Sequence, residues 1–240
     1  MTNSPESMPS SRRPSVVSVR SVFKRSIQVS TRYFVPLFVI GVVTSLPTLL
    51  SGSVDPTHPI FGQLWLGIVV ASLTSALCEA MVIVGTIRAL AGGDARFAES
   101  AMRGLSRTLP VLVAWVLVSL IFALGIVLLI VPGLIAFAAL AVVLPVCVVE
   151  DVRPLEALAR SYELTTGSRW QIFWMYLVTV IGAIIVGTIV DLPLQRPAFA
   201  PISHAIDFLF AAMISSYSGV LTAVIYHDLR VAKEGGAAFD

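Results

Sequence analysis

Between residues 109 and 149 the sequence contains no Asp, Glu, Lys or Arg. A stretch this long without charge cannot cover a surface that faces water. A transmembrane helix needs about 20 apolar residues, so the stretch is long enough for two such helices. Of the 240 residues, 57% are hydrophobic and 12% are charged, whereas about 25% are charged in an average soluble domain. Lipid must therefore be the solvent for much of the chain, and we expect an all-α integral membrane protein.

Apolar runs recur along the whole sequence and predict six transmembrane helices. The predicted spans are residues 34–50, 64–90, 109–131, 134–149, 170–190 and 202–225. We expect Pro132 and Gly133 to end the third span, because proline cannot continue the helical ladder and glycine is free to turn. The fourth span would reach only roughly 24 Å, so its neighbours must shield it or the bilayer must thin around it.

Three amphipathic segments alternate with the spans and are typical of helices that lie in the membrane interface. They cover residues 16–32, 95–107 and 154–166. In the third segment, Pro154 suits the first helical position and Gly167 suits the stop. Leu155, Leu158 and Tyr162 mark its apolar side. The order of amphipathic helix, span, turn and span thus occurs three times, which favours a threefold internal repeat.

The distribution of basic residues predicts the orientation in the membrane. Of the 16 Lys and Arg residues, all but Arg196 lie on the side that holds both termini and the three amphipathic segments. The positive-inside rule places that side in the cytoplasm. We therefore expect a multi-pass protein of a bacterial cytoplasmic membrane with both termini inside. Residues 16–230 form its single transmembrane domain, between a disordered tail at residues 1–15 and a short tail at residues 231–240.

Glu79 is the one carboxylate near the middle of a predicted span. Stripes of small residues mark the second and sixth spans: Gly67, Ala71 and Ser75 in the second, and Ala211, Ser215, Gly219 and Ala223 in the sixth. These stripes predict that the two spans pack together. Ser215 and Tyr217 would lie at a depth similar to that of Glu79, which we expect to be hydrogen-bonded and protonated. Glu79 is then either a satisfied structural acid or part of a proton or cation relay.

Basic residues of the amphipathic segments are candidate contacts for anionic lipid headgroups or for a protein partner. These residues are Arg20, Lys24, Arg25, Arg103 and Arg160. The first segment has the best claim on anionic lipid, because it belongs to a strongly basic N-terminal region. The alternative is a solvated helix face with internal ion pairs, such as Arg160 with Glu156 and Glu163. No nucleic-acid partner is expected.

Several kinds of site are not indicated. The sequence has no phosphate-binding glycine loop and no hydrolase or metalloprotease motif, so we expect neither catalytic residues nor a cofactor. Asp191, His204 and Asp207 are too few for a metal site and are expected to be solvated at the interface. Cys78 and Cys147 lie in apolar runs and are expected to pack as small hydrophobic residues. The first 30 residues lack the apolar core of a secretory signal.

Three runs carry a family resemblance: PGLIAFAALAVVLPVCVVED, PLEALARSYELTTGSRWQIF and the closing YHDLRVAKEG. With them, the chain from about residue 16 to residue 235 resembles a family of bacterial inner-membrane proteins named for the membrane domain of glycerophosphoryl diester phosphodiesterase. That family is polytopic and mostly of unknown function. Its name comes from proteins that carry a soluble phosphodiesterase barrel. No such barrel is present in this sequence, so the resemblance implies no diesterase activity.

These observations favour a non-enzymatic membrane module that organises lipid, interacts with lipid or scaffolds a partner. The alternative is a small-solute transporter or channel that uses Glu79. An enzyme acting on a lipid headgroup ranks last, because no nucleophile and base are visible together. A polar cavity that reaches Glu79 would favour transport, whereas a closed bundle would favour the module.

Overall fold

The structure is a computed structural model that describes residues 18–51, 61–90, 108–128, 130–194 and 200–235, and all regular structure in these ranges is helical. The helices are α1 (Val19–Arg32), α2 (Phe34–Ser51), α3 (Phe61–Leu90), α5 (Thr108–Leu128), α6 (Ile130–Leu140), α7 (Val143–Val149), α8 (Pro154–Thr165), α9 (Arg169–Leu194) and α10 (Ala200–Glu234). The all-α class is thereby confirmed. The predicted interfacial helix at residues 95–107 and the tail at residues 1–15 lie outside the described residues.

The first and third predicted interfacial helices are present as α1 and α8. α1 meets α2 at Tyr33 with a bend of 84°. α8 begins at Pro154, as predicted, and the chain after it passes through Gly167 with φ +90°. That left-handed backbone conformation strains any residue with a Cβ, so glycine is the residue that suits this position.

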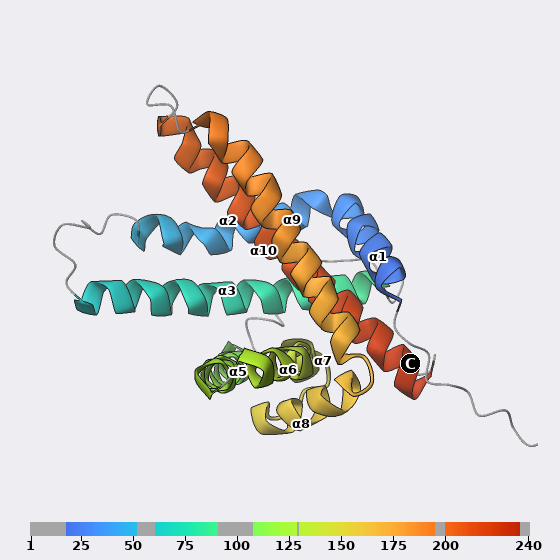
Figure 1. Cartoon of the computed structure of the whole chain (residues 1–240). Coiled ribbons are helices and arrows are strands. Elements are labelled where there is room, and N and C mark those ends of the chain that lie inside the picture. The colour runs from blue at the N-terminus through green and yellow to red at the C-terminus, as the bar shows by residue number, and fades with distance from the viewer. Residues whose placement is uncertain (1–17, 52–60, 91–107, 129, 195–199, 236–240) are drawn as a thin grey trace, which may run out of the picture.

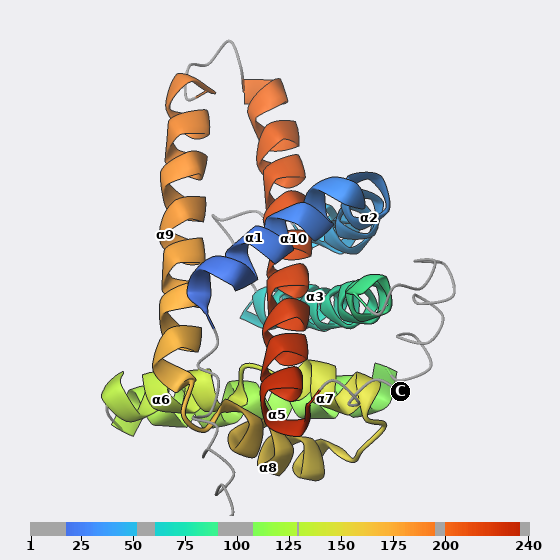
Figure 2. The same cartoon turned by 90° about the vertical axis from the view of Figure 1, so that its right-hand side faces the viewer.

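Three pairs of consecutive helices make up most of the rest of the fold, α2 with α3, α5 with α6, and α9 with α10, and the short α7 packs against α5 and α8. The two views show that these pairs cross one another and do not lie side by side along a single axis (Figures 1 and 2). α10 is the longest of the described helices and touches most of the others, α1, α2, α3, α7, α8 and α9. Its buried residues Leu221, Ile225 and Tyr226 belong to the main hydrophobic core, together with Val82 and Ile83 of α3.

Two of the described helices are long and apolar enough to cross a membrane, α9 over Arg169–Pro193 and α10 over Ala205–Glu234. The bent pair of α1 and α2 makes a third if it is counted as one span. A chain with two or three such helices suits a membrane. Six spans and a threefold repeat stay predictions.

The prediction that Pro132 and Gly133 end the third span was wrong. α5 ends at Leu128 and α6 begins at Ile130, so both residues lie in the first turn of the next helix. Proline is tolerated there, because the first N–H groups of a helix have no partner within it.

The predicted fourth span is not one uninterrupted helix. α6 ends at Leu140, two residues form a turn, and α7 follows from Val143. Pro145 explains the break: it has no N–H to donate to the carbonyl of Ala141, and its ring would clash with that carbonyl in a continuous helix.

The sixth helix is longer than predicted. The span was expected to end at residue 225 and a polar tail to begin at residue 231, but α10 continues to Glu234. Its last two turns are polar, and ion pairs with other helices hold them in place, as described below. A prediction based on local hydropathy therefore underestimated the length of this helix.

Candidate functional site

Glu79 lies where α3 packs against α10, which confirms the predicted contact between the second and sixth spans. Gly219 of α10 allows this close approach. A Cβ at Gly219 would lie 2.8 Å from Cγ1 of Val82 and 3.7 Å from Cγ of Glu79. The small-residue stripe of α10 thus brings the backbone up to the carboxyl side chain.

The carboxyl group of Glu79 is hydrogen-bonded, as predicted, but by a residue that the sequence did not single out. The Thr222 hydroxyl of α10 lies 3.3 Å from Glu79 Oε1 and 2.9 Å from the carbonyl oxygen of Ser218. The Tyr176 hydroxyl of α9 lies 2.7 Å from the same Thr222 oxygen. Because a threonine hydroxyl has one proton, it cannot donate fully to both acceptors. Within the described part of the chain, this contact is the only one that reaches the carboxyl oxygens, so Glu79 retains acceptor capacity.

A cavity of about 290 Å³ adjoins this carboxyl group. Glu79 lines it together with three aromatic side chains, Trp115 of α5, Phe137 of α6 and Tyr176 of α9. Phe137 and Tyr176 meet edge to face, with ring centroids 5.1 Å apart. The rest of the wall is almost entirely aliphatic. The cavity therefore combines one acid with several aromatic rings.

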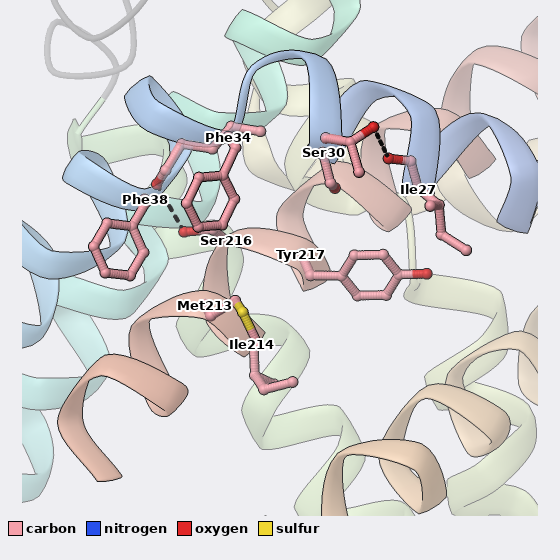
Figure 3. A pocket seen from close by; sticks show the side chains of 10 residues that line it. Ile27, Ser30, Phe34, Phe38, Met213, Ile214, Ser216 and Tyr217 are labelled. Atoms are coloured by element: carbon pink, nitrogen blue, oxygen red, sulfur yellow. Dashed lines mark hydrogen bonds between the residues drawn. The ribbon is translucent and has the colours of Figure 1, made fainter. Parts of the chain in front are cut away.

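Ser215 and Tyr217, which were grouped with Glu79 because a similar depth was predicted for them, do not make its hydrogen bond. Tyr217 instead lines a different cavity, formed between α10 and the bent pair of α1 and α2 (Figure 3). Thr222 could have been found from the sequence, because it follows Gly219 by three residues and so lies on the same helical face. Tyr176 comes from another helix, and no spacing pattern indicates it.

The second cavity, hereafter the α1 groove, has a volume of about 290 Å³ and an almost wholly apolar wall. In Figure 3 the labelled side chains Ile27, Ser30, Phe34 and Phe38 lie on one side, and those of α10, including Tyr217, lie on the other. A neighbouring apolar cavity of about 240 Å³ shares Met213, Ile214 and Tyr217 as its wall.

The predicted basic contacts fall into two groups. Arg20 and Lys24 are exposed on α1. Arg25 is paired with Asp228 of α10 at 2.6 Å, and Arg160 is paired within the protein. Arg103 lies outside the described residues. Arg20 and Lys24 are therefore the predicted basic residues best placed to meet an external anion.

Arg160 belongs to an ionic cluster that joins α7, α8 and α10. Its guanidinium lies 3.2 Å from Glu150 Oε2 and also pairs with Glu234. Glu150 Oε1 accepts a hydrogen bond from the Tyr226 hydroxyl at 2.9 Å, and Arg230 pairs with Glu234 at 2.8 Å. The cluster thus joins the end of α7, the middle of α8 and the end of α10. Arg160 was predicted to lie on the solvated side of α8. In the structure its guanidinium pairs with Glu150 and with Glu234, and the second pair attaches the end of α10 to α8.

No three His, Cys, Asp or Glu side chains come close enough to bind a metal within the described residues. Cys78 and Cys147 are buried thiols, as predicted from their apolar surroundings. Comparisons with protein-family models, with curated proteins and with solved structures find no match for this chain.

Proposed function

We propose that the chain is a non-enzymatic membrane module that binds anionic phospholipid through α1 on the cytoplasmic side of a bacterial inner membrane. The observation that carries this proposal is the continuity between exposed basic side chains of α1 and the apolar groove beside them.

The spacing along α1 supports the proposal. Arg20, Lys24, Ile27 and Thr31 follow one another at intervals of three or four residues, so they lie along one helical face. Ile27 and Thr31 line the α1 groove, while Arg20 and Lys24 extend beyond it and are exposed. A phospholipid whose acyl chain enters the groove would place its phosphate near these two cations.

The electrostatic and apolar terms act together in this arrangement. A basic side chain near an anionic lipid surface contributes about 1 kcal/mol. An acyl chain that moves from lipid into the groove gains close packing and no hydrophobic free energy from water, because lipid tails are as apolar as the groove wall. The Arg25–Asp228 ion pair attaches α1 to α10, so the groove wall is fixed at one end. Two cations therefore supply the preference for anionic lipid, and the groove positions the chain beside them.

Equilibrium binding of a fluorescent phosphatidylglycerol to the purified protein in micelles tests the proposal. We expect the double variant Arg20→Gln and Lys24→Gln to weaken binding about 30-fold, because two contributions of about 1 kcal/mol are lost. Thr31→Trp should also weaken binding, because Thr31 is exposed and the indole would fill the groove. Arg196→Gln removes the same kind of charge from the predicted outer side and is the matched control.

A phosphatidylcholine probe with the same chains should bind more weakly to the wild type and respond little to loss of the two cations. Equal affinity for both lipids, unchanged in both α1 variants, would contradict the proposal.

A second candidate function is transport of a small solute, and the cavity at Glu79 favours it. The carboxyl group lies between α3 and α10, and the cavity wall includes residues of α5, α6, α7 and α9. Solute flux into proteoliposomes that is lost in Glu79→Gln at normal protein abundance would support this function.

A further inference from the structure

We infer that the cavity at Glu79 is a binding site for a small organic cation, of the substituted ammonium class with an apolar or aromatic group attached. Binding of such a ligand requires neither lipid binding at α1 nor transport of a solute, so it can be tested independently of both.

The first argument is the polar content of the cavity. Its wall includes a single acid, Glu79, and no basic residue. The Thr222 hydroxyl is the only hydrogen-bond partner of this carboxyl group among the described residues, and it also serves the Ser218 carbonyl. An isolated carboxylate in apolar surroundings is strongly disfavoured unless it is paired, so the protonated acid is favoured while the site is empty. A ligand with one fixed positive charge would pair the ionised carboxylate after release of its proton, and the occupied site would again carry no net charge.

The second argument is the aromatic content. Trp115, Phe137 and Tyr176 line the same cavity from three different helices. The faces of aromatic rings attract cations, tryptophan most strongly, and several rings around one site recognise substituted ammonium groups. Phe137 is held by edge-to-face contact with Tyr176, so these two rings are fixed relative to each other. A hydrated metal ion or a simple ammonium ion would lose too many hydrogen bonds here, because the wall offers few other acceptors.

The third argument is size and chemistry of the remaining wall. The volume of about 290 Å³ is near the lower limit for small-molecule pockets. Aliphatic side chains of α5, α6 and α7 complete the wall, among them Val118, Leu140 and Leu144. These surfaces suit the methyl groups and the apolar substituent of an alkylammonium ion. The wall has no basic residue to neutralise an anionic ligand, and its few hydroxyl and indole groups are too few for the many hydroxyls of a sugar.

Benzyltrimethylammonium and its uncharged carbon analogue, neopentylbenzene, test the inference, because they have the same shape and differ in charge. Isothermal titration calorimetry with the purified full chain in micelles measures both. We expect the cation to bind saturably and at least tenfold more tightly than the neutral analogue once partition into empty micelles is subtracted. Equal binding of the two compounds, or no saturable binding of the cation, would overturn the inference, and this comparison needs no mutant.

Variants then locate the site. Glu79→Gln should weaken cation binding at least tenfold and leave the neutral analogue unaffected. Trp115→Leu should weaken it several-fold. Asp207→Asn, which removes an exposed carboxylate from α10 well away from the cavity wall, is the matched control and should bind as the wild type does. Tight cation binding that persists in both cavity variants would place the site elsewhere and overturn the assignment.

Discussion

Gly41 lies where α2 packs against α10, and it leaves no room for a larger residue. A Cβ at this position would lie 2.4 Å from Ser216 Oγ and 2.5 Å from the carbonyl oxygen of Ala212. The second of these atoms belongs to the backbone, so it cannot move without shifting α10. Gly182 of α9 has no atom within 4 Å of the same point. The two glycines look alike in the sequence, and tertiary contacts alone separate them.

We predict that Gly41→Ala lowers the free energy of unfolding by about 1–3 kcal/mol, because an extra methyl group in a filled contact forces the helices apart. Gly182→Ala should be neutral or stabilising by up to about 1 kcal/mol, because alanine favours the helix and meets nothing. Unfolding of both variants by SDS in mixed micelles, followed by circular dichroism, measures the difference. Equal stability of the two variants would show that α2 and α10 do not approach as closely as described.

The site also illustrates the limit of sequence patterns at the scale of single residues. Glu79 could be chosen from the sequence because a carboxylate in an apolar span is expensive to bury. Its aromatic neighbours could not, because Trp115, Phe137 and Tyr176 come from three helices that only the fold brings together. Any span in such a chain contains aromatic residues, so their presence alone predicts no site.

Among the helices, α8 shows most clearly which features follow from the local sequence and which follow from tertiary packing. Its start at Pro154 and its stop before Gly167 follow from backbone chemistry and were predicted. The face of α8 that packs against the protein was not predicted correctly. Leu155 is 69% exposed and Tyr162 is 54% exposed, while Ser161 and Thr165 are buried against α6. An outward apolar side suits a helix that touches lipid. The small polar residues, in contrast, allow α8 to approach another helix closely.

The Ser161 and Thr165 side chains of α8 contact a backbone carbonyl group at the C-terminal end of α6. The Ser161 hydroxyl donates to the carbonyl oxygen of Ala139 at 2.9 Å. The Thr165 hydroxyl lies 3.1 Å from the same oxygen and 2.9 Å from the carbonyl oxygen of Ser161, so its one proton is shared between the two. Ala139 is in the last turn of α6, where carbonyl groups have no partner within their own helix. The two side chains therefore act as a cap supplied by another helix.

We predict that the double variant Ser161→Ala and Thr165→Val destabilises the protein by about 1–3 kcal/mol, because a buried carbonyl loses both hydroxyl donors. Amide hydrogen exchange should rise at the end of α6 and along α8. Thr188→Val is the matched control, because the exposed Thr188 hydroxyl donates only to the carbonyl of Ile184 in its own helix. That change should stay within about 0.5 kcal/mol. Equal effects of the two changes would argue against the cap.

At the scale of the whole molecule, the α9–α10 hairpin provides the two described helices that are each long and apolar enough to be a span. Because its two helices run in opposite directions, the start of α9 and the end of α10 lie at one end of the hairpin, and the end of α9 and the start of α10 lie at the other (Figure 2). The basic residues predict that the first end is cytoplasmic.

Single cysteines test this topology in a background of Cys78→Ala and Cys147→Ala, both of which replace buried thiols. We predict that a membrane-impermeant maleimide labels Arg196→Cys in intact cells and labels Ala238→Cys only after permeabilisation. Labelling of Ala238→Cys in intact cells would reverse the orientation and exclude a cytoplasmic site for lipid on α1.

The sequence by itself determined the helical class, most helix boundaries, the preference for lipid and the contact between α3 and α10. Each of these depends on composition or on spacing within one segment, and such local terms are already present in the unfolded chain. Only the tertiary structure decided that the helix pairs cross, that polar residues extend α10 to Glu234, and that an acid and three aromatic rings share a cavity. These features depend on contacts between residues far apart in the chain, whose energies exist only once the helices have packed.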